Sequence, residues 1–229
     1  MYDIVFISYG EPNADENWKH IKQMFPMAKR VKDVKGLHQA HIAAAKKCFT
    51  KMFWVIDADA ELMPDFDFNF EVSEWDLETV HVWRSINPIN DLEYGYGGVK
   101  LLPRSLTLNM DTSMPDMTTS ISDKFKAMPE ISCVTGFNTD ALSTWRGAFR
   151  ECAKLASKTI PGQVDEETEK RLEIWLTVGA EKQYGKIAMH GAACGKQFGE
   201  HYRGNVEALA MLNDFDYLEE EFNEHKDSF

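Results

Sequence analysis

Residues 51–62, KMFWVIDADAEL, form the stretch that decides the fold. After Lys51 the run MFWVI is apolar without alternation, which is typical of a central strand in a parallel sheet covered on both faces. Asp57 and Asp59 follow this run directly, and carboxylates are costly to place beside a buried strand unless they have a partner. Ligands of open α/β sheets bind at the carboxyl ends of the strands. The stretch therefore predicts a buried strand that ends at a ligand site.

Strand and helix signals alternate around this stretch. Strands are predicted at residues 3–9, 30–34, 51–56, 79–83 and 99–102, and helices at residues 13–25 and 36–49. This alternation is the signature of a nucleotide-binding α/β sheet. We therefore expect an α/β fold with a Rossmann-like mixed sheet flanked by helices.

The second half is predicted to be mainly helical. Residues 105–132 are interpreted as loop-rich because they hold Pro115, Pro129 and clustered Ser and Thr. Apolar residues at helical spacing predict helices at 140–157 and 166–177, and an acidic amphipathic helix at 206–222. A short β-like run precedes His190.

Composition sets the size and argues against some partners. A chain of 229 residues with 44% hydrophobic residues can bury the core of one α/β domain. The net charge of −12 argues against a protein that wraps a long polyanion, although residues 1–51 hold nine Lys or Arg and five acids. No apolar run approaches the roughly 20 residues of a membrane span, and residues 1–10 are interpreted as a strand, not a signal peptide. Four scattered cysteines without a CxxC pair indicate reduced thiols in a cytoplasmic protein.

The carboxylate pair Asp57 and Asp59 indicates a specific chemistry. Carboxylate oxygens are hard ligands that suit Mg²⁺ or Mn²⁺, and such an ion also binds phosphate oxygens. A divalent ion would neutralise the leaving group of a sugar diphosphate. The alternative is that the two acids cap the turn before Pro64. The apolar strand that precedes them favours the metal site.

The first 62 residues resemble the nucleotide-sugar-binding half of glycosyltransferases of the GT-A type. The resemblance is carried by ISYGE at 7–11, GLHQAH at 36–41 and the DxD motif at 57–59. It implies a GT-A fold and metal-dependent transfer of a sugar from a nucleotide-sugar to a hydroxyl acceptor, with Mn²⁺ or Mg²⁺ as cofactor. Asp59 would hold the metal, and Asp57 would face the ribose or share the metal. Further nucleotide-sugar contacts would come from Tyr9, Glu11, Lys35 and His41.

In the second half, the resemblance implies a late metal ligand and a general base. His190 is the predicted ligand, and His201 is its competitor. GFNTD at 136–140 resembles the Gly-Phe-x-x-Asp turn of inverting GT-A enzymes, in which the acid deprotonates the acceptor. Asp140 is therefore the first candidate base and Asp116 the second, while a helix cap is the alternative role for Asp140. A retaining enzyme would need no such base, and the sequence leaves the stereochemistry open.

Further ligand contacts are predicted on a tyrosine-rich loop and on two cations. NDLEYGYGGVK at 90–100 combines glycines, which permit close backbone approach, with Tyr94 and Tyr96, which can stack on a sugar or base of the acceptor or donor. The alternative is a tight turn with surface tyrosines. Lys100 and Arg146 are candidates for contact with the diphosphate. No Glu-Asp pair follows the Gly-Tyr-Gly-Gly loop, a departure that leaves the acceptor mechanism open.

The whole chain also resembles a group of T-even-like bacteriophage proteins. The similar segments are residues 81–104, 115–122, 137–157 and 212–222. This resemblance implies a phage-encoded protein in the host cytoplasm, with hydroxymethylated bases in phage DNA as the first acceptor to consider. A saccharide or protein acceptor, and a non-enzymatic phage protein with a degenerate GT-A fold, are the alternatives. A nucleotidyltransferase ranks lower because SYGEPNADE lacks a glycine-rich, lysine-bearing loop.

Taken with these resemblances, the chain is expected to be a single GT-A-like domain of residues 1–229. Residues 1–104 would form the nucleotide-sugar-binding half. Residues 105–229 would form the acceptor half and the C-terminal helices. The expected partners are a nucleotide-sugar donor and the acceptor, with no membrane.

Overall fold

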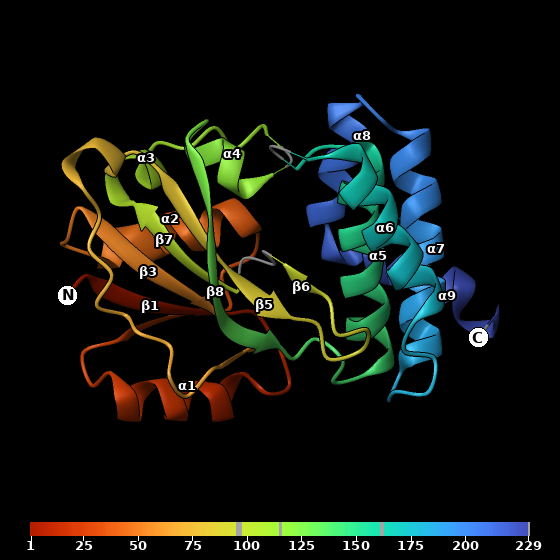
Figure 1. Ribbon diagram of the computed structural model, residues 1–229, viewed down its shortest axis with the longest axis horizontal. Coiled ribbons are helices and arrows are strands. Elements are labelled where there is room, and N and C mark those ends of the chain that lie inside the picture. The colour runs from red at the N-terminus through yellow and green to blue at the C-terminus, as the bar shows by residue number, and fades with distance from the viewer. Residues whose placement is uncertain (95–97, 115, 161–162, 229) are drawn as a thin grey trace. The chain divides into compact units, whose positions relative to one another are not determined.

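The computed structural model describes residues 1–94, 98–114, 116–160 and 163–228 (Figure 1). The chain forms two compact units. The sheet unit consists of Met1–Ile86, Glu93–Thr112 and Met117–Gly136. The helical unit consists of Asn87–Leu92, Ser113–Asp116 and Phe137–Phe229.

One mixed sheet organises the sheet unit. Its strands are β1 (Asp3–Ser8), β2 (Lys29–Lys32), β3 (Met52–Asp57), β4 (Ala60–Leu62), β5 (Val80–Ile86), β6 (Glu93–Tyr94), β7 (Val99–Pro103) and β8 (Phe125–Thr135). The order across the sheet is β2-β1-β3-β7-β5-β8-β4, and β6 pairs with β5. β1 runs parallel to β2 and β3, whereas β7 is antiparallel to β3 and β5. β8 runs parallel to β5 and antiparallel to β4, so parallel and antiparallel pairs both occur beyond β3.

β3 is buried on both faces, as its apolar run predicts. Trp54 packs with Phe6 and Trp83 on one face, and Val55 packs with Ala44 on the other. All five apolar residues of the strand are fully buried. β3 pairs in parallel with β1 and antiparallel with β7, as the expected mixed sheet allows.

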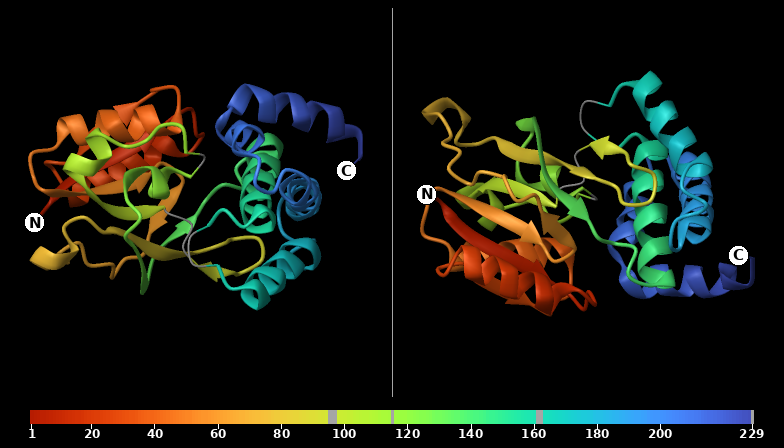
Figure 2. Two further views of the ribbon diagram at one scale, coloured as in Figure 1. Left: turned by 90° about the horizontal axis from the view of Figure 1, so that it is seen from above. Right: turned by 60° about the horizontal axis from the view of Figure 1, so that its bottom comes forward.

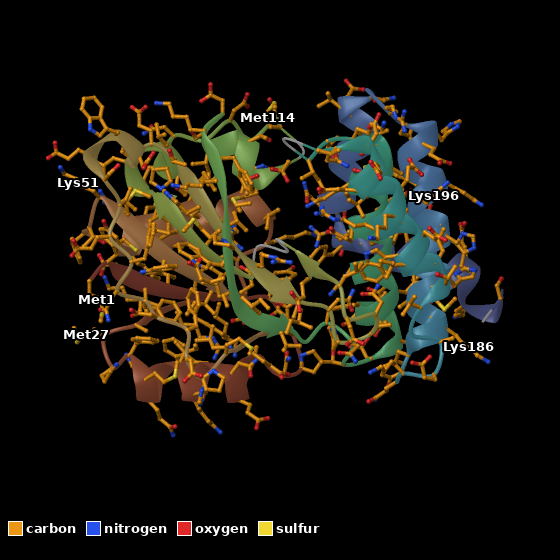
Figure 3. All side chains as sticks on the ribbon, viewed as in Figure 1. Met1, Met27, Lys51, Met114, Lys186 and Lys196 are labelled. Atoms are coloured by element: carbon orange, nitrogen blue, oxygen red, sulfur yellow. The ribbon has the colours of Figure 1, made fainter. Side chains whose placement is uncertain are left out.

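Two helices cover the two faces of the sheet at β1 and β3 (Figure 2). α1 (Ala14–Met24) contributes Ile21 to the core that contains Trp54, and α2 (Leu37–Lys47) contributes Ala44 and Ala45 to the opposite core. The small side chains of α2 let this helix approach the sheet closely. Outside these cores, Met27 and Lys51 are exposed in the segments that precede β2 and β3 (Figure 3).

The prediction that residues 105–132 are loop-rich is wrong. They contain most of α3 (Arg104–Leu108), all of α4 (Met117–Ile121) and the first part of β8. Pro129 lies where the pairing of β8 with β5 shifts from Met128 to Ile131, and an irregular stretch of this kind tolerates a missing N–H. Several side chains in the first half of β8 are exposed, so the strand lacks the continuous apolar run that marks β3.

The helical unit contains α5 (Ala141–Ser157), α6 (Asp165–Thr177), α7 (Gly185–His201), α8 (Val206–Ala210) and α9 (Phe215–His225). Single 3₁₀ turns occur in both units at Glu74–Asp76, Met211–Asn213 and Lys226–Ser228. The predicted helices at 140–157 and 166–177 are confirmed to within one residue at each end.

Two predictions about this unit are corrected. The run before His190 is not β-like but belongs to α7. The single helix predicted at 206–222 is divided into α8 and α9, because Asp214 accepts hydrogen bonds from the N–H groups of Asp216 and Tyr217 and caps a new helix.

Three glycines bring α7 very close to α5. Gly191, Gly195 and Gly199 recur at every fourth residue of α7 and face the backbone of α5. A Cβ atom at Gly195 would lie 2.1 Å from the carbonyl oxygen of Phe149. Cβ atoms at the other two positions would lie 2.5 and 2.3 Å from carbonyl oxygens of α5. These distances are far below van der Waals contact, so only glycine fits the three positions at this helix spacing.

The expected α/β class is confirmed, with a mixed sheet flanked by helices and a helical C-terminal part. In the described part of the chain, no helix has the length and apolar character needed to cross a membrane.

Candidate active site

Three neighbouring strands bring charged residues to one edge of the sheet. Ile7 near the end of β1 is in register with Asp57 at the end of β3, so Glu11 and the pair Asp57 and Asp59 follow parallel strands that end together. From the other side of β3, antiparallel β7 places Lys100 opposite Val55. Acids from two loops and a lysine from a strand are therefore gathered at the edge where α/β sheets bind ligands.

Lys100 and Asp57 form an ion pair at this edge. Nζ of Lys100 donates to Oδ2 of Asp57 at 2.6 Å. The lysine side chain is only 3% exposed, whereas the aspartate side chain is 34% exposed. A buried ammonium group is costly without an opposite charge. The pair therefore anchors Lys100 and fixes the orientation of a carboxylate that still reaches the surface.

Asp59 lies where negative side chains outnumber positive ones. Burial, together with the charges of Asp57 and Glu11, raises the pKa of its carboxyl to about 7, and the charge of Lys100 opposes this rise. One lysine thus faces three acids. A cation placed beside Asp59 would relieve this repulsion, because it would stabilise the charged form of the carboxylate.

Backbone contacts hold the turn that carries the two acids. The N–H of Gly136 donates to the carbonyl of Asp59 at 2.6 Å, and Nδ2 of Asn17 donates to the carbonyl of Ala58 at 2.8 Å. β4 then starts at Ala60 and pairs with β8. The turn is therefore fixed by α1 on one side and by the end of β8 on the other. Gly136 opens the GFNTD turn, but nothing in the sequence indicates its contact with Asp59, and Asn17 has no distinctive sequence signal.

His41 is buried on α2 beside this ion pair. Burial, aided by the charge of Lys100, lowers the pKa of its imidazole to about 4, although Asp57 acts in the opposite sense. Nδ1 lies 2.8 Å from the carbonyl oxygen of Leu37. Because a carbonyl oxygen only accepts, Nδ1 carries the proton and Nε2 is an acceptor. Nε2 is buried and has no hydrogen-bond partner among the described residues.

Tyr9 and Lys35 lie in the loops that follow β1 and β2. Tyr9 is 38% exposed, and its N–H donates to Oε2 of Glu11 at 2.6 Å. Lys35 is exposed and lies two residues before Leu37, the first residue of α2. Both therefore belong to the sheet unit that carries Asp57, Asp59, Lys100 and His41.

Asp140 caps α5 in the helical unit. Its carboxylate accepts from the N–H of Ser143 at 2.8 Å, from Oγ of Ser143 at 2.7 Å and from Oγ1 of Thr139 at 3.3 Å. Burial raises the pKa of Asp140, but the hydrogen bonds outweigh it and hold the pKa below its usual value. These contacts match the alternative role of Asp140, that of a helix cap. A role as general base stays a prediction.

The other predicted residues of the helical unit have structural neighbours of their own. An oxygen of Asp116 lies 3.9 Å from Nζ of Lys154. The guanidinium of Arg146 lies over the ring of Phe215, 4.2 Å from its centroid. Stacking of a guanidinium on an aromatic ring supplies packing as well as charge interaction.

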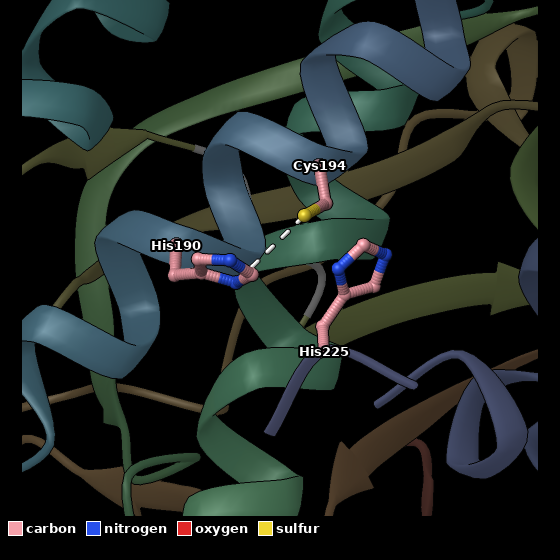
Figure 4. Close-up of side chains that lie close together, drawn as sticks. All are labelled: His190, Cys194 and His225. Atoms are coloured by element: carbon pink, nitrogen blue, oxygen red, sulfur yellow. Dashed lines mark hydrogen bonds between the residues drawn. The ribbon is translucent and has the colours of Figure 1, made fainter. Parts of the chain in front are cut away.

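His190 lies on α7 with partners that the sequence analysis did not consider. Nε1 of Trp145 donates to Nδ1 of His190 at 3.2 Å, and Cys194 and His225 lie beside it (Figure 4). The spacing of His190 and Cys194, four residues apart, was the available signal, but it was hidden because this segment was interpreted as β-like. The competitor His201 is exposed at the end of α7.

The two tyrosines of the predicted acceptor loop are not described by the structure. Tyr96 lies outside the described residues. The backbone of Tyr94 ends β6, opposite Ser85 of β5, but its side chain also lies outside them. Their role stays a prediction.

Comparisons with known proteins give no family for the chain and include a distant likeness to a solved structure. No protein-family model matches the chain, and no curated protein matches it. Among solved structures it is similar to the mannosyltransferase PcManGT from Pyrobaculum calidifontis in complex with GDP-Man and Mn²⁺. The sequence identity is 13%, the match covers 94% of this chain and 79% of that chain, and the TM-score is 0.41. This likeness assigns no role to any residue of the chain.

Proposed function

We propose that the chain is a GT-A-type glycosyltransferase that moves a sugar from a nucleotide-sugar to a hydroxyl acceptor. The observation that carries the proposal is the position of Asp57 and Asp59. They follow a fully buried strand, at the edge of the sheet where β1 also ends, and they stand beside the buried cation of Lys100. Acids with surplus negative charge at this edge suit a ligand that arrives with a divalent cation.

The donor atoms at this edge fit Mn²⁺ or Mg²⁺. Mg²⁺ in nucleotide sites is usually held by one or two carboxylates, with substrate phosphates and water completing the shell. Asp57 and Asp59 would provide the two carboxylates. The raised pKa of Asp59, caused by burial and by neighbouring acids, supports a cation beside it. When bound, the ion would neutralise charge on the leaving nucleoside diphosphate.

The remaining residues of the sheet unit have proposed roles in donor binding. Lys100 orients Asp57 through their 2.6 Å hydrogen bond and would supply a positive charge to the diphosphate. Tyr9 and Glu11, in the turn after β1, would contact the nucleoside, and Lys35 would contact a phosphate. His41, whose Nε2 is a buried acceptor without a partner among the described residues, would accept a hydrogen bond from a donor hydroxyl after a small movement of α2.

The base and the acceptor are proposed from the sequence alone. Asp140 and then Asp116 are the candidate bases of an inverting reaction, Arg146 would contact the diphosphate, and Tyr94 and Tyr96 would contact the acceptor. The first acceptor to test is a hydroxymethylated base in DNA, which rests on the resemblance to T-even-like phage proteins. The net charge of −12 argues against broad contact with duplex DNA, so saccharide and peptide acceptors belong in the same screen.

Calorimetric titration with UDP, GDP and CDP, with and without Mn²⁺, tests the proposal. We expect one nucleotide to bind only with Mn²⁺, and the binding to be lost in Asp59→Asn and Asp57→Asn. Asp65→Asn is the matched control, because Asp65 is an exposed acid eight residues after Asp57 in the same connecting region. If no nucleotide binds under any condition, the glycosyltransferase proposal is wrong and the non-enzymatic alternative takes its place.

A further inference from the structure

Three side chains of the helical unit gather metal-binding atoms in one place. His190 and Cys194 lie on α7, and His225 is the last residue of α9. One ligand atom from each side chain lies within 4.8 Å of the other two (Figure 4). In the described part of the chain, this is the one group of three or more His, Cys, Asp or Glu that meets this spacing.

The arrangement follows from the helices that carry the residues. Residues four apart on a helix lie on the same face, so α7 presents His190 and Cys194 together. α9 contacts α5, the helix that also packs against α7, and this places His225 within 5.5 Å of His190 between ring centroids. All three side chains are partly buried, so they are shielded but can be reached from solvent.

The spacing of His190 and Cys194 matches a tetrahedral site. Zn–N bonds are about 2.0–2.1 Å and Zn–S bonds about 2.3 Å, so tetrahedral ligands N and S lie about 3.6 Å apart. Nδ1 of His190 and Sγ of Cys194 are separated by 3.7 Å. The two side chains therefore need little rearrangement to share an ion, and His225 needs a rotation of its side chain.

We propose that His190, Cys194 and His225 bind a transition-metal ion, with Zn²⁺ as the best fit. Imidazole and thiolate are borderline and soft ligands, which favour Zn²⁺ over Mg²⁺ or Mn²⁺. Three protein ligands leave a fourth position for water or a small ligand. The negative charge of Glu221 interacts electrostatically with Cys194 and would offset part of the positive charge of the ion.

This proposal does not depend on the proposed function. Its residues all belong to the helical unit, whereas Asp57 and Asp59 belong to the sheet unit and offer only hard oxygen ligands. In this proposal His190 shares an ion with Cys194 and His225. The sequence had predicted that His190 shares a metal with Asp57 and Asp59.

Trp145 lies next to the site, so its fluorescence can report the binding of an ion. Its Nε1 donates to Nδ1 of His190, and its ring stacks on His225 with an interplanar angle of 23°. Nδ1 of His190 cannot accept this hydrogen bond and bind an ion at once. Ion binding through Nδ1 therefore replaces the indole donor, and the metal–ligand bonds must offset that loss. The emission of Trp145, which is fully buried, should change when the site is filled.

Titration of the reduced full-length protein with Co²⁺, followed by competition with Zn²⁺, tests the site. We expect thiolate-to-cobalt charge-transfer absorption at one equivalent and its loss when Zn²⁺ is added. Cys194→Ala should abolish the band, and His225→Gln should weaken Co²⁺ affinity by at least about tenfold. His201→Gln, an exposed histidine on the same helix, is the matched control and should behave as wild type. Asp59→Asn should keep the band, which separates this site from the proposed active site.

Three outcomes would overturn the proposal. The first is the absence of a charge-transfer band in the wild-type protein. The second is a band that survives Cys194→Ala but is lost in Cys133→Ala. That result would place the cobalt ion near Asp57 and Asp59, because Cys133 interacts with the charges of these two residues. The third is an affinity in His225→Gln equal to that of wild type. Circular dichroism of each variant, with Cys194→Ser as a second substitution, shows whether a lost band reflects a lost ligand or a lost fold.

Discussion

The ammonium group of Lys100 donates to the carboxylate of Asp57 at 2.6 Å, and the two partners differ tenfold in exposure: 3% for the lysine side chain and 34% for the aspartate side chain. The lysine is therefore the member that depends on the pair. Antiparallel β7 supplies it from inside the sheet, while β3 supplies the acid at its end. The unequal burial makes the two halves of the pair experimentally distinguishable.

Asp57→Asn should destabilise the protein more than Lys100→Met. The first change leaves a buried ammonium without its carboxylate, which we expect to cost about 2–3 kcal/mol, at the low end for buried pairs because Asp57 is partly exposed. The second removes the buried charge, keeps an apolar stem and should cost about 1 kcal/mol or less. Urea unfolding of both variants and of Asp65→Asn measures the difference. Equal costs, or a larger cost for Lys100→Met, would contradict the assignment of the lysine as the dependent partner.

Asp59→Asn should stabilise the protein above neutral pH. The carboxyl has a pKa of about 7 in the folded protein, raised from 3.8 by burial and neighbouring acids. The folded state therefore binds a proton more strongly than the unfolded state, and wild-type stability falls as pH rises from about 4 to 7. The full penalty, on the order of a few kcal/mol, applies above pH 7 and is absent in the amide.

Unfolding free energies of wild type and Asp59→Asn, measured from pH 4 to pH 8, check this prediction. The two curves should converge near pH 4 and separate with increasing pH. Mn²⁺ at pH 8 should stabilise wild type and leave Asp59→Asn unchanged. Parallel curves at all pH values would show that Asp59 does not carry the surplus charge.

His41→Leu should remove an acid sensitivity of the fold. The imidazole has a pKa of about 4 in the folded protein, lowered from 6.5 by burial and by Lys100. A base with a lowered pKa costs stability as pH falls from about 6.5 through 4, because the unfolded chain takes up the proton first. The difference in unfolding free energy between His41→Leu and wild type should therefore favour the variant increasingly over this range. His20→Gln, at an exposed histidine of α1, is the control for the loss of a histidine as such.

Substitutions of Asp140 can separate a helix cap from a general base. Asn also accepts a hydrogen bond at the cap position, so Asp140→Asn should cost little stability, whereas Asp140→Ala should cost about 1–2 kcal/mol. Once a donor and an acceptor are known, kcat decides the role. A base would lose activity in both variants, with Asp140→Asn folded. A cap alone would leave the Asn variant active.

The sequence was most informative where one segment carries its own signal. β3 could be predicted because its five apolar residues fill both faces, and α5 because its apolar residues repeat at helical spacing and Asp140 caps it. β8 was missed because Pro129 and exposed side chains conceal a strand that exists through pairing with β5 and β4. The short run before His190 resembles a strand because the small residues of α7 carry little periodicity, whereas the close packing of this helix on α5 is seen only in the fold.

The candidate site could be predicted in part for the same reason. Asp57 and Asp59 are adjacent to a strong strand, so their placement at the edge of the sheet followed from the sequence. The ion pair of Asp57 with Lys100 depends on the antiparallel register of β7 with β3, which the sequence of neither strand predicts by itself. The set of His190, Cys194 and His225 joins α7 and α9, between which the chain forms α8 and a 3₁₀ turn, and only the folded chain brings these residues together.

The glycine contact between α7 and α5 has a consequence for preorganisation. Gly191 lies directly after His190, and a Cβ atom there would meet the carbonyl oxygen of Trp145 at 2.5 Å. The separation of His190 from Trp145 is thus set by main chain resting on main chain, not by the size of exchangeable side chains. An ion that binds His190 and Cys194 meets ligands that are already held in place. Binding should therefore restrict the motion of α7 little further and cost little conformational entropy.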